Sequence, residues 1–189
     1  MGDERVVRDD DAHGAETTVR ETVPVSPDPT RPQRLVEEAW MDRALELARE
    51  AAADGDIPVG AVVVDASGVI IGEGRNTRER DGDPTGHAEV VALRAAAEAK
   101  GEWRLTECTL VVTLEPCPMC AGAVVASRVP RVVLGAWDPK MGACGSVWDV
   151  VRDRRSVHRA EVVGGVREGE AAHLLLDFFG GRRADVDPG

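Results

Sequence analysis

Two cysteines and a histidine in this chain have the residue types and spacing needed to bind a metal ion. Cys117 and Cys120 form a C-x-x-C pair, which lets two thiolates share one tetrahedral zinc ion. By themselves the two cysteines also fit a redox dithiol, or two buried residues at the start of a helix. His87 offers a third ligand of a type that zinc accepts. Three protein ligands leave the fourth position to water, as in catalytic rather than structural zinc sites.

Glu89 follows His87 by two residues and is the candidate proton carrier. Hydrolysis by activated water needs a group that takes a proton from the water and passes it to the departing group, which one carboxylate can do. Residues two apart on an ideal helix point about 200° apart, so these side chains converge only if His87 has non-helical torsions at a helix boundary. The preceding Pro84-Thr85-Gly86 favours such a boundary. Alternatively, Glu89 is a first-turn acid that complements the helix dipole.

His-Ala-Glu followed by Pro-Cys-x-x-Cys is the known signature of zinc-dependent base deaminases. Zinc in such a site lowers the pKa of water to about 7, so that hydroxide forms at neutral pH. The other cysteines, Cys108 and Cys144, have no histidine or second C-x-x-C nearby in sequence, so we expect small buried hydrophobic residues. We expect surface or packing roles for the remaining histidines, which are His13, His158 and His173.

The elements that must position these residues alternate between helices and strands. Apolar residues at helical spacing, with start and stop signals, predict helices at 35–53, 87–100, 117–127 and 168–179. Short β-rich runs predict strands at 59–65, 69–74, 109–114, 131–135 and 161–163, and Ala66-Ser67-Gly68 has hairpin-turn chemistry. This order predicts an α/β fold, a three-layer α/β/α sandwich with a mixed sheet, in which both ligand sets lie at strand-to-helix junctions.

Composition limits the kind of partner. The 189-residue chain has the length of about one domain, a formal net charge of −11 and only 3% aromatic residues. The charge argues against a broad phosphate-binding surface. The low aromatic content argues against an extended stacking platform for single-stranded nucleic acid. Any recognition of a base is therefore expected to be local.

Three segments follow from the local composition. Residues 1–33 are acidic and contain several prolines but few large apolar residues, which predicts a disordered extension. Residues 34–183 form the predicted zinc-dependent deaminase domain, and residues 184–189 are a short tail. No apolar stretch approaches the roughly 20 residues that cross a bilayer, and the start lacks the order of a signal peptide. We therefore expect a cytoplasmic protein with no membrane partner.

The sequence resembles the bacterial tRNA-specific adenosine deaminases of the cytidine-deaminase-like superfamily over roughly residues 34–183. The resemblance rests on Gly86-His87-Ala88-Glu89, on the run from Thr113 to Ala123, and on the segment from Gly135 to Ser146. The first two motifs occur throughout the superfamily, whereas the third narrows the resemblance to the tRNA-specific enzymes.

This resemblance implies a homodimer with a cytidine-deaminase-like fold, a five-stranded sheet and one Zn²⁺ per chain. The implied reaction converts adenosine to inosine at the wobble position of an arginine tRNA anticodon stem-loop. Hydroxide attacks C6 of the flipped base, and Glu89 shuttles the protons. The resemblance further implies that Asn76 binds the purine, that Gly86 belongs to the substrate site, and that Asp138 contacts the sugar of a neighbouring nucleotide. Asn76 also fits a turn residue at a strand end.

The C-terminal helix leaves a choice between packing and RNA contact. Phe178-Phe179 followed by Arg182-Arg183 resembles the family helix that lies against the RNA loop, but two phenylalanines also suit core packing. Adjacent residues face different ways, so one member of the pair can face RNA.

Some features depart from the family pattern, namely the acidic extension, the net charge, Trp137 and Cys144. They leave open a deaminase of a free base or nucleoside, such as guanine, cytosine or cytidine. A non-catalytic structural zinc-binding domain, in which Glu89 is incidental, is a second alternative.

Overall fold

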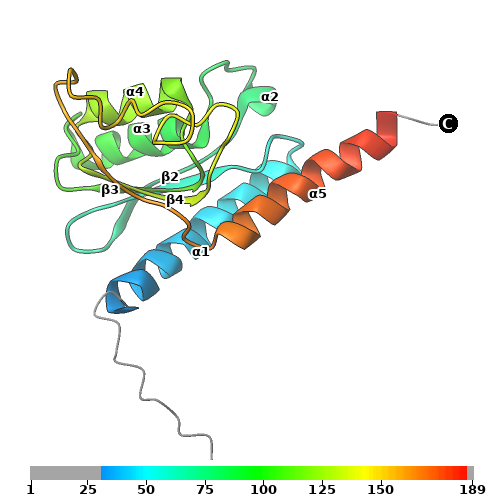
Figure 1. Ribbon diagram of the computed structural model, residues 1–189, viewed down its shortest axis with the longest axis horizontal. Coiled ribbons are helices and arrows are strands. Elements are labelled where there is room, and N and C mark those ends of the chain that lie inside the picture. Colours follow the sequence, from blue (N-terminus) through cyan, green and yellow to red (C-terminus); the bar gives the residue numbers. More distant parts are fainter. Residues whose placement is uncertain (1–30, 187–189) are drawn as a thin grey trace, which may run out of the picture.

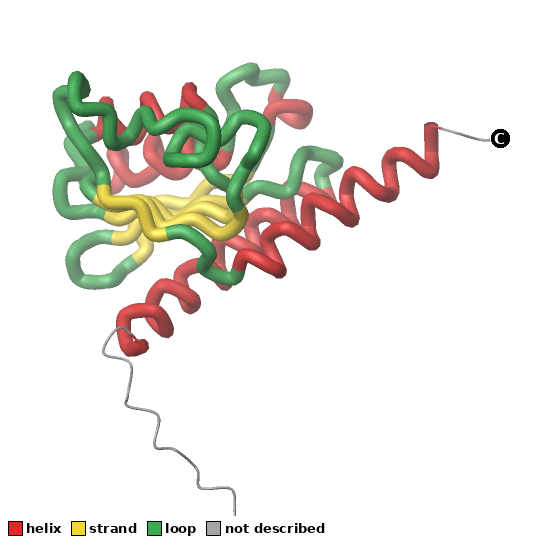
Figure 2. The backbone as a smooth tube through the Cα atoms, viewed as in Figure 1, coloured by secondary structure: helices red, strands yellow, loops and turns green. Residues whose placement is uncertain are grey.

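Five strands form one mixed sheet in the computed structural model, which describes the backbone of residues 31–186 and the side chains of residues 32–181. The strands are β1 (Gly60–Val64), β2 (Ile70–Arg75), β3 (Thr109–Leu114), β4 (Arg131–Ala136) and β5 (Glu161–Val163). Their order across the sheet is β2-β1-β3-β4-β5. β1 pairs antiparallel with β2 and β3, whereas β3, β4 and β5 run parallel. Figure 2 shows the strands together as one layer between the helices. The predicted hairpin and mixed sheet are confirmed.

Helices cover both faces of this sheet, as the sandwich prediction requires. The helices are α1 (Arg31–Ala53), α2 (Arg78–Asp81), α3 (Ala88–Lys100), α4 (Pro118–Ser127) and α5 (Glu168–Val186). Figure 1 shows α3 and α4 on one face and α1 and α5 on the other. Each face has its own apolar core, built largely from alternate residues of the same strands. None of these helices is both long and apolar enough to cross a membrane.

Small residues bring α3 very close to the edge strand β2. Cβ atoms on Gly72 and Gly74 would collide with the backbone of α3 at Ala92 and Ala88. Glycine in β2 and alanine in α3 therefore allow backbone-to-backbone contact between the two elements. Because Ala88 is the first residue of α3, this contact fixes the end of the helix that follows His87.

Two helix boundaries differ clearly from the prediction. α1 begins at Arg31 rather than near Leu35, because Pro32 is tolerated in a first helical turn, where its missing N–H is not needed. α5 continues to Val186, past the predicted end at Phe179 and through Gly180 and Gly181. A helical glycine costs only about 1 kcal/mol relative to alanine. The predicted segments 1–33 and 184–189, and His13, otherwise lie outside the described residues.

The short helix α2 was missed by the sequence analysis. Its first turn is capped from a distant loop, since the buried Asp56 carboxylate accepts hydrogen bonds from the Glu79 and Arg80 amides at 2.9 and 3.0 Å. Asp56 precedes α2 by more than 20 residues, so no local pattern announces this cap. α2 follows β2 directly and shapes the turn that carries Asn76.

Candidate active site

Two helix N-termini bring the three candidate metal ligands together. His87 is the N-cap of α3, with extended torsions of φ −79° and ψ 147°, and Cys117 is the N-cap of α4, with φ −70° and ψ 172°. Pro118 occupies the first turn of α4, where it costs no hydrogen bond, and Cys120 lies one turn inside. The non-helical backbone at His87 is the condition that the sequence analysis set for His87 and Glu89 to converge.

The donor set fits a tetrahedral zinc ion. The Nδ1 atom of His87 lies 3.7 Å from the Sγ atom of Cys117 and 3.5 Å from that of Cys120. Ordinary zinc–sulfur and zinc–nitrogen bonds at a tetrahedral angle put two such ligand atoms about 3.6 Å apart. All three ligand atoms lie within 4.8 Å of one another, and this is the one such group among the described residues. One Zn²⁺ per chain therefore fits these residues.

The surroundings of the cysteines favour a thiolate. Hydrogen bonds from Cys120 and His87 lower the pKa of Cys117 to about 4. The hydrogen bond to Cys117 raises the pKa of His87. Unpaired amides and the positive end of the α4 dipole lie at the same place and also favour negative charge. Cys117 is therefore the thiol whose surroundings favour negative charge, whereas its hydrogen bond with Cys120 raises the pKa of the Cys120 thiol.

Glu89 lies in the first turn of α3 and is only 4% exposed. Burial raises the pKa of its carboxyl, and a hydrogen bond links it to Cys120. An ordinary first-turn acid points into solvent, whereas this side chain is enclosed beside the candidate ligands. A buried carboxyl with a raised pKa is suited to both accepting and releasing a proton.

A cavity of about 330 Å³ opens beside the metal ligands, a size that suits a small ligand such as a base. Its wall includes His87, Glu89 and Cys117. Large apolar side chains also line it, namely Ile57, Val59, Leu114 and Met141. The reactive groups and a mostly apolar enclosure therefore meet in one place.

Asn76 and Asp138, two of the predicted substrate contacts, both line this cavity. Asn76 is 5% exposed, and its Oδ1 atom is buried without a hydrogen-bond partner. Buried polar atoms are seldom left unpaired, so this amide is available to a ligand. Asp138 is oriented by its own turn, because its Oδ1 atom accepts the Lys140 amide at 2.9 Å.

Gly86, the third predicted contact, is not among the described residues that line the cavity. Its carbonyl accepts a hydrogen bond from the Thr77 amide at 2.8 Å. A Cβ on Gly86 would come within 2.9 Å of the Thr77 hydroxyl. Its geometry therefore shows a packing contact with the turn that carries Asn76.

Two cavity residues were missed by the sequence analysis. Arg78 brings a cation to the wall, and Glu115 brings a second buried carboxylate, 2% exposed. Arg78 follows Asn76 closely in sequence, which was a usable signal. Glu115 entered the sequence analysis only within the run from Thr113 to Ala123, because no local pattern shows which groups its carboxylate contacts.

Several other candidates lie away from the site. Cys108 and Cys144 are buried, as expected, and burial raises the pKa of the Cys144 thiol to about 12. The rings of His158 and His173 contact the backbone carbonyls of Val129 and Gly169 at 2.7 Å. These four side chains thus have packing or surface roles.

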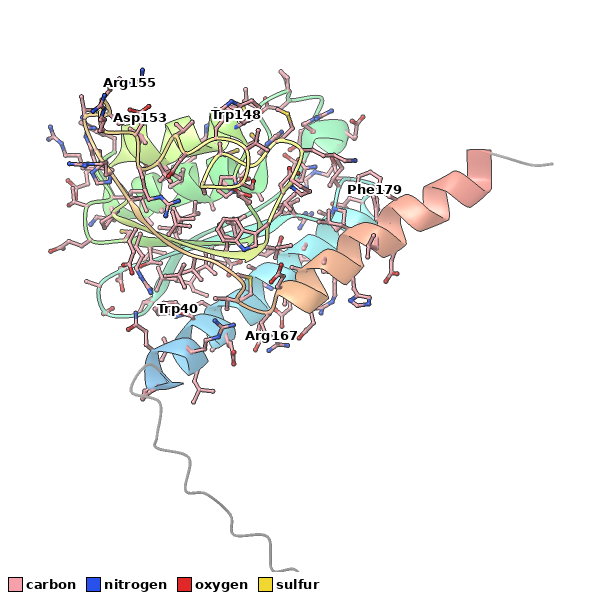
Figure 3. All side chains as sticks on the ribbon, viewed as in Figure 1. Trp40, Trp148, Asp153, Arg155, Arg167 and Phe179 are labelled. Atoms are coloured by element: carbon pink, nitrogen blue, oxygen red, sulfur yellow. The ribbon has the colours of Figure 1, made fainter. Side chains whose placement is uncertain are left out.

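The aromatic pair on α5 divides between packing and exposure. Phe178 is half-buried, and Phe179 is 43% exposed on the part of α5 that extends beyond the sheet (Figure 3). Their rings meet edge to face, with centroids 5.5 Å apart. One member is therefore free to meet a partner, while the side chains of Arg182 and Arg183 lie outside the described residues.

Comparison with known proteins gives a consistent family match. The model of the cytidine and deoxycytidylate deaminase zinc-binding region matches residues 35–136. A tRNA-specific adenosine deaminase of Bacillus subtilis is 47% identical over 143 residues, covering 76% of this chain and 88% of that protein. A tRNA(Ile)-lysidine synthase of Deinococcus radiodurans is 53% identical over 150 residues, covering 79% of this chain. The chain spans only 26% of the length of that synthase.

The fold has close counterparts among solved structures. One comes from a study of A-to-I editing by tRNA:A34 deaminases at the wobble position of transfer RNA. It superposes with a TM-score of 0.70 at 39% identity, covering 72% of this chain and 99% of the other. The match therefore extends over nearly the whole of that compared chain.

Proposed function

Because this chain belongs to the cytidine and deoxycytidylate deaminase family, and within it to the tRNA-specific adenosine deaminases, we propose that it converts adenosine to inosine at the wobble position of an arginine tRNA anticodon. The observation that carries the proposal is the cavity that two of the metal ligands, His87 and Cys117, line together with the buried carboxylate of Glu89 and the amide of Asn76. A tRNA substrate places the enzyme in the cytoplasm.

His87, Cys117 and Cys120 would hold one Zn²⁺, since their ligand atoms already have near-tetrahedral separations. Bound zinc supplies Lewis-acid chemistry and allows water to ionise near neutral pH. The two helix N-termini keep the ligands in place and stabilise the thiolates. The apolar walls exclude bulk water from the reacting base.

Glu89 would move the protons. It is buried beside the ligands and its pKa is raised by that burial, so its carboxylate can take a proton from water and deliver it to the ring nitrogen next to C6. A second proton then goes to the amino group, which leaves as ammonia. The balance is one water consumed and one ammonia released for each adenosine converted to inosine.

Asn76 would bind the base that enters the cavity. Its buried Oδ1 atom has no hydrogen-bond partner among the described residues, so a polar edge of the purine would supply the missing hydrogen bond. Asp138 and Arg78, on the same cavity wall, would contact the sugar and phosphate of the flanking nucleotides. Phe179 on α5 offers an exposed ring to the rest of the loop.

A second copy of the chain would cover the outer face of α3 and α4. α4 is apolar nearly all round, and Met119 is 38% exposed on it. A groove of about 310 Å³ lies between α3 and α4, lined chiefly by small and apolar residues that include Ala123, Ala126 and Trp103. An apolar face with no partner within the chain is expected to be buried in an assembly, and a homodimer is the family arrangement.

A charged residue introduced at position 126 tests the proposed dimer surface. Ala126→Glu places a carboxylate in the groove and is expected to halve the mass measured by sedimentation equilibrium. Leu35→Glu is the matched control, because Leu35 is an exposed apolar residue on α1, over the opposite face of the sheet. An unchanged mass for Ala126→Glu would contradict this dimer surface.

The function itself is tested with synthetic RNA. The zinc-loaded protein is incubated with an arginine anticodon stem-loop that carries the wobble adenosine, and inosine is measured by nuclease digestion and mass spectrometry. A stem-loop with guanosine at that position, free adenosine, guanine and cytidine are the controls. Turnover of only a free base or nucleoside would overturn the RNA assignment, and zinc binding without any turnover would favour a structural domain.

A further inference from the structure

A buried carboxylate outside the metal ligand set, that of Glu115, gathers the hydrogen bonds of one loop. Its Oε1 atom accepts the amides of Cys144 and Ser146 at 2.9 and 3.1 Å. Its Oε2 atom accepts the Asp138 amide at 3.0 Å and lies 2.5 Å from the Ser146 hydroxyl. Glu115 follows the end of β3, so it fastens the segment 138–146, here called the 138–146 loop, to the sheet.

The loop is shaped to admit this carboxylate. A Cβ on Gly142 would collide with the carboxylate of Glu115 and the hydroxyl of Ser146, so only glycine leaves room for the contact. The Ala143 amide also donates to the Pro116 carbonyl at 2.8 Å, next to Glu115 in sequence. The 138–146 loop is therefore held against the segment that leads into the candidate ligand Cys117.

Asp138 is the member of the loop whose position matters most for a ligand. It lines the cavity, and its backbone amide is one of the four groups that meet Glu115. The hydrogen bond from the Lys140 amide orients the Asp138 side chain within its turn. The position of that turn depends on where the Asp138 backbone lies. Glu115 therefore determines the place from which Asp138 can reach a bound nucleotide.

We propose that Glu115 is a positioning residue for substrate binding, which acts by holding the backbone of Asp138 at the cavity wall. A carboxylate accepts hydrogen bonds at both oxygens, whereas the isosteric amide of glutamine accepts at only one. Glutamine therefore cannot satisfy the Asp138 amide and the Cys144 and Ser146 amides together. The proposal rests on the proposed function for its catalytic readout, but the hold on the loop can be measured separately.

The catalytic test is a double-mutant cycle on the anticodon stem-loop with Glu115→Gln, Asp138→Ala and the double variant. Glu115→Gln is expected to lower kcat/KM about tenfold, mainly through KM, with one zinc per chain retained. In the Asp138→Ala background the same change is expected to cost less than about twofold, because its effect passes through Asp138. Equal effects in both backgrounds would overturn the proposal and assign Glu115 a direct or general role.

The matched control is Glu37→Gln. Glu37 is also a buried acid, 3% exposed, but it pairs with Arg131 on the other face of the sheet. Loss of a buried carboxylate at that position is expected to lower stability without changing KM. A similar rise in KM for Glu37→Gln would show that the effect of Glu115→Gln is not specific to the loop.

Hydrogen exchange of the zinc-loaded protein tests the hold without any substrate. Amides of the 138–146 loop are expected to exchange at least about tenfold faster in Glu115→Gln and at the wild-type rate in Glu37→Gln. Unchanged exchange in Glu115→Gln would overturn the proposal even if the stem-loop is the true substrate. If exchange is faster in Glu115→Gln but the wild-type protein does not deaminate the stem-loop, the proposed function is wrong and the hold of Glu115 on the loop is supported.

Discussion

Glu89 and Asn76 are two polar side chains that the fold buries around one cavity. Glu89 is enclosed next to the candidate ligands, and Asn76 has an oxygen with no partner. Burial without full pairing has a free-energy cost, so neither arrangement serves stability alone. Both are expected where a ligand supplies the missing interaction, and both can be tested by removing one functional group at a time.

Glu89→Gln is expected to keep one zinc per chain and to lower kcat on the stem-loop by at least about 100-fold, because proton transfer to or from a positioned acid or base typically contributes that much. Glu98→Gln, on an exposed position of the same helix, should leave both values unchanged. Zinc content by atomic emission and single-turnover kinetics measure the two effects. Normal turnover in Glu89→Gln would remove this residue from the proton-transfer role.

Asn76→Ala is expected to cost more in substrate binding than in stability. Since Oδ1 has no partner in the free protein, its loss should change the free energy of unfolding little, whereas a missing hydrogen bond to the base should lower kcat/KM about tenfold or more. Urea unfolding measures the free energy of unfolding, and kinetics on the stem-loop measure kcat/KM. A large loss of stability with normal kinetics would make Asn76 a turn residue only.

At the scale of elements, the contact between β2 and α3 sets the position of the ligand-bearing N-terminus. Glycines in β2 lie directly against the backbone of α3, and His87 caps the same helix. The close contact between β2 and α3 leaves no space for a methyl group on Gly72 or Gly74. A packing change in the strand should therefore affect the position of the metal ligands.

Gly74→Ala puts a methyl group against the backbone at Ala88 and is expected to destabilise the protein by about 1–3 kcal/mol, as overpacking does. Because the strain falls next to His87, the affinity for zinc should also decrease. Gly180→Ala in α5, which meets nothing within 4 Å, should instead stabilise its helix by about 1 kcal/mol. Thermal unfolding and zinc titration against a chelator distinguish the two, and equal zinc affinity in both would contradict the coupling.

At the scale of the whole molecule, the candidate metal site joins the N-termini of two neighbouring helices. His87 comes from α3, and both cysteines come from α4. Their shared ion would join the two elements that form one face of the sandwich. The three-layer fold thus depends on apolar packing over one face of the sheet and on packing plus a metal link over the other.

Removing zinc is therefore expected to lower the melting temperature and to abolish turnover, with both restored by added Zn²⁺. Linkage gives about 2.7 kcal/mol of stabilisation at a free zinc concentration 100 times Kd. Differential scanning calorimetry with and without a chelator measures the shift in melting temperature. The melting temperature of Cys120→Ala should change neither with the chelator nor with added Zn²⁺. A zinc-independent melting temperature in the wild-type protein would contradict the metal link.

The sequence determined the chemistry of this site because that chemistry depends on local spacing. His87, Cys117 and Cys120 each lie in a helix-start pattern that can be recognised within a few residues, and the alternation of elements was enough for the sandwich. The extended backbone at His87 also followed from a local geometric requirement.

Tertiary structure alone decided which distant groups meet. Asp56 caps α2 across more than 20 residues, and Glu115 binds the 138–146 loop across a similar distance along the chain. Gly86 contacts Thr77 and its substrate role stays a prediction, while Asn76 and Asp138 reach one cavity from different parts of the chain. Such contacts depend on strand order and on how closely the layers pack, and no short sequence pattern encodes either of these.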